Sequence, residues 1–427
     1  MNEIKKILLD DDRPLLCLLM VNAILISFPF IRDMISFYTM CVITVYSVIL
    51  LIYRLFSGDL KIKPRIITWL ALVFFASLLV SLIVKRDTVS EIMTNTIMIV
   101  INLIVYAAPM TAQDEETRTS HFIFLQRVTV YFGTTVICAV MFLNFIICKN
   151  IIVTPDGITL VPYMPVQRYE GIMGCNYIGF LAFLDIAFSV SIIFRKETSW
   201  TERAVLSVFC ALNAVPLVIS GCRSSQIAMI VFLGILVLIA IYRMLDRKIL
   251  FLIVLAVALA GFLALVWKIA MSRSYSLENL SLYDAINLIS SHRLPIYRLA
   301  IENGSSTLFG GGTQPVVDYF GWLCHMHNIL LEIYCFYGIF AAASFIGELL
   351  IIFIFGLKFL CTSGRKGGYI YQCIIAFSVM TGILAQNMTD CFIFTQPYSV
   401  SNIAFHAVLG YVLYFITKDQ GRVTDNE

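Results

Sequence analysis

Charged residues are scarce in this chain of 427 residues: only 13% are Asp, Glu, Lys or Arg, whereas 60% are hydrophobic and the mean hydropathy is +0.89. Soluble domains carry about 25% charged residues, so this composition excludes an ordinary soluble protein. The charges gather in short clusters between apolar runs of about 18 to 25 residues, the length that a bilayer core requires. The sequence therefore predicts an all-α polytopic membrane protein.

A large net charge and metal-ligand motifs are lacking as well. The formal net charge is +3, which indicates neither a nucleic acid nor an acidic partner. The twelve cysteines form no CxxC pair and no His/Cys ligand spacing, so we interpret them as packing residues. The acidic residues of the predicted external segments form no DxD motif or paired carboxylates, so we expect no metal and no other cofactor.

Four acidic residues fall inside apolar runs or at their ends: Asp185, Glu332, Glu348 and Asp390. An ionisable group at such a position is either functional or paired within the helix bundle, and the sequence leaves both interpretations open.

We predict twelve transmembrane helices, which together form one domain over residues 1–427. With a cytoplasmic amino terminus, most of the 30 basic residues fall in cytoplasmic connections, so both termini are predicted to be cytoplasmic. No internal repeat is found, which disfavours a transporter built from inverted repeats. The clearest interruptions are at 114–121 and 195–203. The predicted spans are 14–31, 35–53, 66–84, 92–111, 128–148, 174–194, 203–219, 224–242, 249–268, 327–357, 369–389 and 398–416.

Two predicted external segments are long, 149–174 and 269–326. The second is too long to be a simple connection, so we expect it to have its own structure and to contribute to the active site. Apolar spacing predicts short amphipathic helices at 282–289 and 292–302.

Arg223 lies in the shortest external connection, SGCRSS at 220–225, at the predicted start of a helix. A guanidinium beside a helix amino terminus suits a phosphate group, because its N–H donors and the backbone N–H groups reach the same oxygens. An arginine that extends to lipid headgroups explains the position equally well.

Arg293 and Arg298 lie in the second long external segment, with Tyr297 one helical turn after Arg293. Solvated loop arginines are common, and that is the simpler interpretation.

His325 and His327 precede an apolar run, and Asn328 follows His327. Interfacial anchoring would explain both histidines. However, a histidine in the first turn of a helix is favoured in its neutral form by the positive helix end, which suits His327 to act as a general base.

In order, spacing and external placement, these motifs resemble those of the bacterial O-antigen ligase and O-antigen or capsule polymerase superfamily. The most specific piece is His327-Asn328, nine residues, then Gly338, although Ala341 stands where the family often has a second Gly, Thr or Tyr. The other pieces are Arg168-Tyr169-Glu170-Gly171 with Asn176, the turn 220–225, His292-Arg293 with Tyr297, and the FGGG segment 309–312.

The resemblance implies a metal-independent, inverting glycosyltransferase of the bacterial cytoplasmic (inner) membrane. Its partners would be an undecaprenyl-pyrophosphate-linked glycan donor, a glycan acceptor and other polysaccharide-assembly proteins. Arg223 and Arg293 would bind the pyrophosphate with help from Arg168 and Arg298. His327 would take the acceptor proton, supported by Asn328 and Tyr297.

We expect a polymerase of repeat units, because repeat-unit polymerases are the more diverse group and the match is diffuse. A ligase with a different acceptor is the nearest alternative. A flippase or transporter of lipid-linked sugars, and a membrane scaffold or sensor, are alternatives from other classes.

Overall fold

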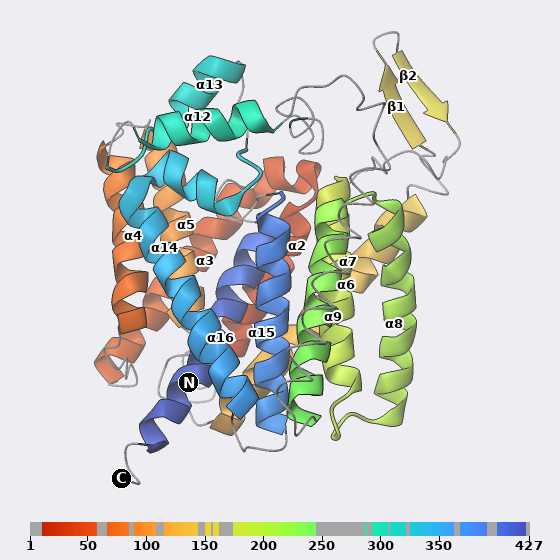
Figure 1. Cartoon of the computed structure of the whole chain (residues 1–427). Helices are drawn as coiled ribbons and strands as arrows, with labels where there is room; N and C mark the ends of the chain where they lie inside the picture. Colours follow the sequence, from red (N-terminus) through yellow and green to blue (C-terminus); the bar gives the residue numbers. More distant parts are fainter. Residues whose placement is uncertain are drawn as a thin grey trace, which may run out of the picture.

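The computed structural model describes residues 11–57, 66–84, 89–107, 115–143, 150–154, 157–161, 174–244, 287, 293–305, 308–321, 325–362, 368–390 and 399–423. These ranges contain thirteen helices and one antiparallel pair of strands (Figure 1). The elements are α2 (Arg13–Ile26), α3 (Pro29–Ser57), α4 (Ile66–Val84), α5 (Val89–Ala107), α6 (Glu115–Phe142), β1 (Asn150–Thr154), β2 (Gly157–Val161), α7 (Cys175–Ile193), α8 (Trp200–Ile219), α9 (Arg223–Met244), α12 (Leu294–Gly304), α13 (Gln314–Phe320), α14 (Ile329–Thr362), α15 (Gly368–Asn387) and α16 (Val400–Val423).

The prediction of a helical, polytopic membrane protein is confirmed. Seven described helices are long and apolar enough to cross a membrane: α4, α6, α7, α8, α9, α14 and α15. Apolar stretches of 10–17 residues occur in α2, α3 and α16. Eleven of the twelve predicted spans fall on described helices, and 249–268 lies outside the described residues.

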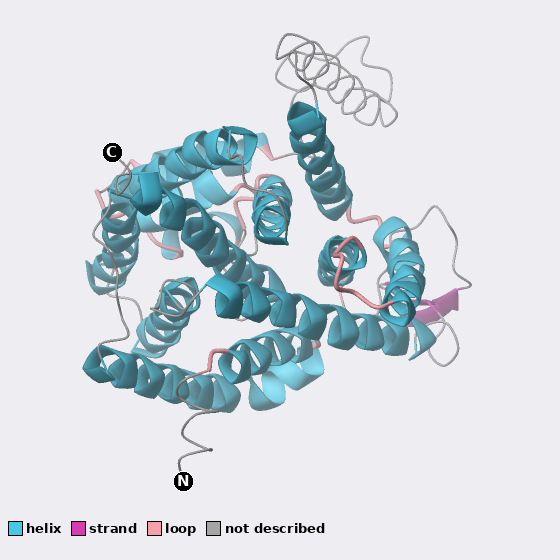
Figure 2. Ribbon diagram, turned by 90° about the horizontal axis from the view of Figure 1, so that it is seen from below, coloured by secondary structure: helices cyan, strands magenta, loops and turns pink. Residues whose placement is uncertain are grey.

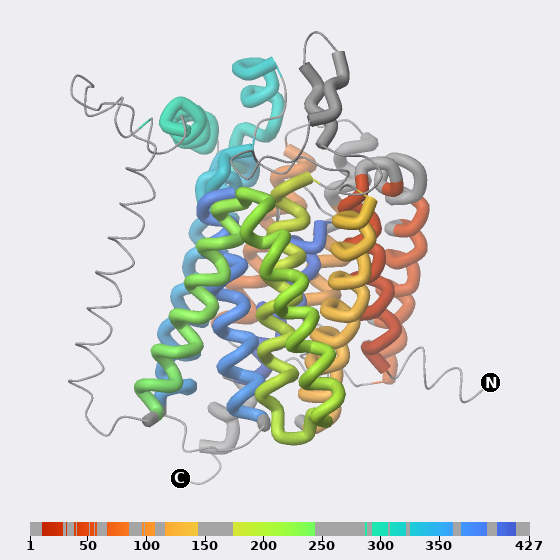
Figure 3. The backbone as a smooth tube through the Cα atoms, turned by 90° about the vertical axis from the view of Figure 1, so that its right-hand side faces the viewer, coloured from red at the N-terminus to blue at the C-terminus, as the bar shows by residue number. Residues whose placement is uncertain are grey.

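The long helices run side by side, and their buried faces identify the centre of the bundle. In both α7 and α15, 72% of the apolar window is buried, against 22% in α8. The outer face of α8 therefore exposes apolar side chains such as Val208 and Val215, as expected for contact with lipid. α12 and α13 lie beyond the ends of the long helices (Figure 3).

The polar stretch 114–121 is not an interruption, since α6 begins at Glu115 and continues through it. Asp12, which precedes α2, forms ion pairs with Arg54 of α3 and Arg118 of α6, and all three are almost fully buried. Burial opposes ionisation of Asp12, but a hydrogen bond with His121 and the two arginine charges outweigh it and lower its pKa to about 2. These ion pairs therefore stabilise the buried start of α6, where unpaired charges would disfavour a buried helix.

The structure adds to the helical fold one strand pair that the sequence prediction did not include. Thr154 lies opposite Gly157 in an antiparallel hairpin, and the strands lie at the periphery when the bundle is viewed along its axis (Figure 2). The sequence NIIVTPDGITLV places β-branched residues on both sides of a Pro-Asp-Gly turn, which is a hairpin signal. Long apolar runs indicate transmembrane helices but give no indication of so short a pair of strands.

Candidate functional site

Segments from three helices meet at the carboxyl end of α15. After Asn387 the chain makes a tight turn, in which the N–H groups of Thr389 and Asp390 bond to the Gln386 carbonyl at 2.9 and 2.8 Å. The last carbonyl groups of a helix have no partners within it, so this end offers hydrogen-bond acceptors and a partial negative charge. Residues at the beginnings of α9, α12 and α14 form hydrogen bonds with this end.

His327 lies beside Asp390, and the distance from Nδ1 to Oδ1 is 3.1 Å. The carboxyl side chain is 10% exposed and the imidazole 28% exposed, so the histidine has the more accessible position. An ionised carboxylate at Nδ1 favours the tautomer that carries its proton there, which leaves Nε2 as the basic atom. The pair therefore has the arrangement of a general base oriented by a carboxylate.

The backbone of His327 corrects one detail of the sequence prediction. α14 begins at Ile329, so His327 precedes the helix, and the argument that its first turn favours a neutral imidazole does not apply. His327 has φ +51° and is the one non-glycine residue of the described chain with positive φ. Left-handed backbone at such a residue costs about 1–3 kcal/mol and persists where surrounding contacts enforce it.

Two side chains hold this strained turn. Asn328 caps α14, because its Oδ1 accepts from the N–H groups of Leu330 and Leu331 at 3.0 and 3.1 Å. Its Nδ2 donates to the Met388 carbonyl at 3.4 Å, which links the cap to the end of α15. The fully buried Glu332 accepts from the Met326 N–H at 3.2 Å. The residues on both sides of His327 are thus fixed.

Arg293 approaches the same helix end from α12. It is the residue before the first turn of α12, it is half-buried, and its guanidinium donates to the Thr389 carbonyl. Since His327 contacts the next residue, Asp390, the cation and the imidazole share one anchoring turn. The N–H of Tyr297 bonds to the Arg293 carbonyl at 2.9 Å, which places this half-buried aromatic residue one turn further along α12.

Arg223 is the first residue of α9 and is exposed, while the turn around it is anchored. The Ser220 hydroxyl accepts from the Cys222 N–H at 3.3 Å. The buried Ser225 accepts from Gln386 of α15 at 3.2 Å. Gln386 belongs to the last turn of α15, so the Arg223 turn is joined to the helix end that Arg293 and His327 contact.

A break in α14 explains the glycine motifs. Gly338 has φ +83° and ψ −172° inside the helix, and a Cβ atom there would lie 2.3 Å from the Leu308 carbonyl oxygen. Gly310 packs against the break, and a Cβ atom added at Gly310 would lie 2.7 Å from the Gly338 nitrogen. The Gly311 N–H bonds to the Cys335 carbonyl at 3.0 Å. The FGGG segment therefore packs directly on the helix that His327 precedes.

The other predicted arginines are placed differently. Arg298 is 80% exposed and pairs with Glu302 at 2.8 Å, one turn along the outer face of α12. It is not among the described contacts with the end of α15. Arg168 lies outside the described residues, as do Tyr169, Glu170 and Gly171.

His325 lies close enough to the pair to interact with it electrostatically. Burial lowers the pKa of His325, the neighbouring His327 lowers it further, and Asp390 partly offsets both effects. In the sequence, motif spacing alone distinguishes the two histidines and gives no sign that His325 lies close to this site.

The four acidic candidates divide equally between site and bundle. Asp390 and Glu332 hold the turn that carries His327. Glu348 accepts from the Tyr106 hydroxyl at 2.5 Å, and Asp185 from the Thr134 hydroxyl at 3.3 Å, both within the bundle. In the described part of the chain, no three His, Cys, Asp or Glu side chains are grouped as metal ligands would be.

Comparison with known proteins identifies the domain that contains these residues. The family model described as O-antigen ligase matches residues 205–346, from within α8 to the part of α14 that follows the Gly338 break. A search of curated proteins found no significant match. The matched region holds Arg223, Arg293 and His327, whereas Asp390 lies beyond it. The chain therefore contains an O-antigen ligase family domain at residues 205–346, the domain of membrane glycosyltransferase-type enzymes that ligate or polymerise O-antigen.

Proposed function

We propose that the protein polymerises oligosaccharide repeat units carried on undecaprenyl pyrophosphate, at the external face of the bacterial inner membrane. The observation that carries this proposal is the anchoring of His327 and Arg293 on neighbouring residues of one helix end, Asp390 and Thr389. A base and a cation held this close match the two needs of glycosyl transfer from a diphosphate.

The transfer proceeds in one displacement. Nε2 of His327 takes the proton from the acceptor hydroxyl, whose oxygen attacks the anomeric carbon of the donor. The bond between that carbon and the pyrophosphate oxygen breaks, and the configuration inverts. The imidazolium then faces the Asp390 carboxylate, which stabilises it, until its proton is released to water.

The leaving group is a lipid pyrophosphate, which departs readily once its charge is stabilised. Arg293 and Arg223 supply that charge, and the amino end of α9 at Arg223 adds backbone N–H groups. Fixed cations at the departing oxygens perform the role that a divalent ion has in other transferases, so we propose a metal-independent reaction. We propose that Arg168 and Arg298 make smaller contributions to pyrophosphate binding. The contribution of Arg298 is smaller because its side chain lies on the outer face of α12.

The arrangement across the membrane belongs to the same proposal. Residues 1–427 form one domain of twelve spans with both termini cytoplasmic. The segment 269–326 faces the exterior, where α12 presents Arg293. The hairpin at 150–161 and α12 lie at the same end of the bundle, which supports a common external side for the two long segments (Figure 1).

A ligase would use the same donor chemistry and differ in its acceptor, so it is the nearest alternative. A flippase for lipid-linked sugars predicts charged groups around a cavity at the membrane midplane and two gates. Here Arg293, His327 and the turn that carries Arg223 are all anchored at one end of α15, which favours transfer at a surface over transport.

The test is chain extension by the purified protein, with a lipid-pyrophosphate repeat unit as substrate, in the presence and absence of chelator. We expect extension in both conditions and its loss in His327→Ala and Arg223→Ala, while Asp318→Asn on the exposed surface of α13 extends normally. Full turnover in both site variants would refute the site, and loss with chelator would refute the metal-free reaction. Transfer only to a different glycan acceptor would identify a ligase.

A further inference from the structure

A polar pocket lies at the opposite end of the bundle from His327. It has a volume of about 720 Å³ and lies between the amino ends of α6 and α15 and the connection from α7 to α8. Since α15 runs from Gly368, beside this pocket, to Asn387, just before the turn that carries Asp390, the two places are about 30 Å apart along one helix. The proposed transfer reaction uses none of the residues that line it.

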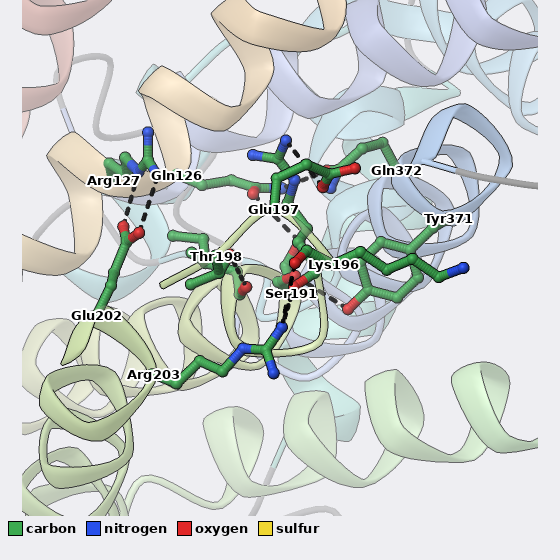
Figure 4. Close-up of polar contacts among 12 residues, drawn as sticks. Gln126, Arg127, Ser191, Lys196, Glu197, Thr198, Glu202, Arg203, Tyr371 and Gln372 are labelled. Atoms are coloured by element: carbon green, nitrogen blue, oxygen red, sulfur yellow. Dashed lines mark hydrogen bonds and ion pairs between the residues drawn. The ribbon is translucent and has the colours of Figure 1, made fainter. Parts of the chain in front are cut away.

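One residue that lines the pocket, Gln372, has a buried side-chain amide. Gln372 of α15 lines the pocket and is fully buried. Its Oε1 accepts from Gln126 at 3.1 Å, and Oε1 of Gln126 accepts from Ser191, also at 3.1 Å (Figure 4). Nε2 of Gln372 has no hydrogen-bond partner among the described residues. A buried donor without a partner is costly, so an acceptor group that reaches it would be favoured.

The walls carry fixed cations. Arg127 is held by two bonds to Glu202, at 2.9 and 3.0 Å. Arg195, whose side chain is 18% exposed, meets Glu197 only at 3.4 Å, and its carbonyl accepts from Arg203 at 2.7 Å, which fixes the connection that carries it. The close-up shows this polar group gathered around the connection between α7 and α8 (Figure 4).

The chemistry of the lining selects a ligand with both signs of charge. Three arginines, Arg13, Arg127 and Arg195, line the pocket together with Glu116 and Glu197. The arginines and the Gln372 amide offer donors to a phosphate, while the two carboxylates can accept from an ammonium group. Ile123 and Phe124 add apolar surface. A pocket of this kind at the ends of transmembrane helices lies at the level of lipid headgroups.

We propose that this pocket binds the headgroup of an ethanolamine phospholipid from the leaflet on that side. The phosphate accepts from Nε2 of Gln372 and from Arg195, and the ammonium group is held by Glu116 and Glu197. The glycerol end lies against Ile123 and Phe124. The bound lipid would join α6, α15 and the connection between α7 and α8 without taking part in the transfer reaction.

The test is native mass spectrometry of the detergent-purified, full-length protein, titrated with phosphatidylethanolamine, phosphatidylglycerol or inorganic phosphate. We expect preferential retention of phosphatidylethanolamine and a roughly tenfold loss in Arg195→Gln and Gln372→Leu, the effect of removing about one charge-assisted hydrogen bond. Glu116→Gln combined with Glu197→Gln should remove the preference over phosphatidylglycerol. Arg298→Gln, which changes an exposed cation at the other end, should bind as the wild type does.

Unchanged retention in Arg195→Gln would overturn the site. Displacement of the lipid by inorganic phosphate at equal concentration would overturn the lipid as the ligand, in favour of a free phosphate compound. Arg195 is outside the helices, so its variant tests the site even where Gln372→Leu disturbs the contact with Gln126. Gel filtration and thermal unfolding of each variant establish that it is folded.

Discussion

Nδ1 of His327 and Oδ1 of Asp390 lie 3.1 Å apart, although 63 residues separate them in the chain. The contact joins the turn before α14 to the turn after α15. In the proposed mechanism Asp390 orients the imidazole, and this task can be tested separately from that of the base itself.

Asp390→Asn should lower kcat of glycosyl transfer with little change in KM for the donor. The amide keeps the size of the side chain but loses the charge that selects the tautomer and stabilises the imidazolium, and general-base catalysis contributes about 10²–10⁴-fold. Steady-state kinetics of wild type, His327→Ala, Asp390→Asn and the control Asp318→Asn test this. A wild-type kcat in Asp390→Asn would exclude the orienting role.

Arg293→Gln should weaken donor use much more than Arg298→Gln does. Both residues belong to α12 or directly precede it, but Arg293 reaches the end of α15 whereas Arg298 is 80% exposed and paired with Glu302. We expect KM for the donor to rise about tenfold or more in Arg293→Gln, since a charge-assisted contact is lost, and less than about twofold in Arg298→Gln. Equal effects of the two substitutions would contradict the geometry.

Gly338→Ala should destabilise the protein and remove activity together. The residue has φ +83°, and the new methyl group would lie 2.3 Å from the Leu308 carbonyl oxygen, so we expect a loss of at least about 1–3 kcal/mol. The matched control is Gly347→Ala in the same helix, where a Cβ atom would meet Leu70 only at 3.5 Å. Thermal unfolding in detergent should separate the two, and similar midpoints would show that the break in α14 is not required.

His325 should make stability depend on pH below neutrality. Burial and His327 lower its pKa in the folded protein, so below the ordinary value of about 6.5 the unfolded chain takes up this proton more readily. Acidification from about pH 7 to pH 5 therefore favours unfolding of the wild type relative to His325→Gln.

The measurement is the difference in unfolding midpoint between these two proteins as a function of pH. The other titrating groups are present in both, so their contributions cancel to first approximation. A difference that stays constant over this range would show that His325 does not titrate as its surroundings predict.

Helix positions could be predicted from the sequence because a long apolar run is itself the property that places a segment in the membrane. The runs at 66–84 and 174–194 agree closely with α4 and α7. The start of α6 was wrong because Arg118 is buried through a contact with Asp12, 106 residues away, and no local pattern reports such a partner.

Part of the candidate site could likewise be predicted from the sequence and part could not. The predicted topology puts His327, Arg293 and Arg223 on one side of the membrane, and contacts with α15 bring His327, Arg293 and the turn that carries Arg223 to one helix end. The role of Asp390 was open, since its position at the end of a span fits pairing and catalysis equally. Nothing in the sequence predicts the positive φ of His327, because residues other than glycine rarely adopt it. The nine-residue spacing to Gly338 is also compatible with an ordinary helix.

The break at Gly338 divides α14 into two parts that can move independently. The 24 residues that follow it extend about 36 Å, enough to cross the hydrocarbon layer without the segment before the break. The first nine residues are held by the FGGG segment and by Asn328 and so move with the turn that carries His327. We therefore expect the lower part of α14 to tilt as bilayer thickness changes while the distance between His327 and Asp390 stays constant, which would let one enzyme work in membranes of different lipid composition.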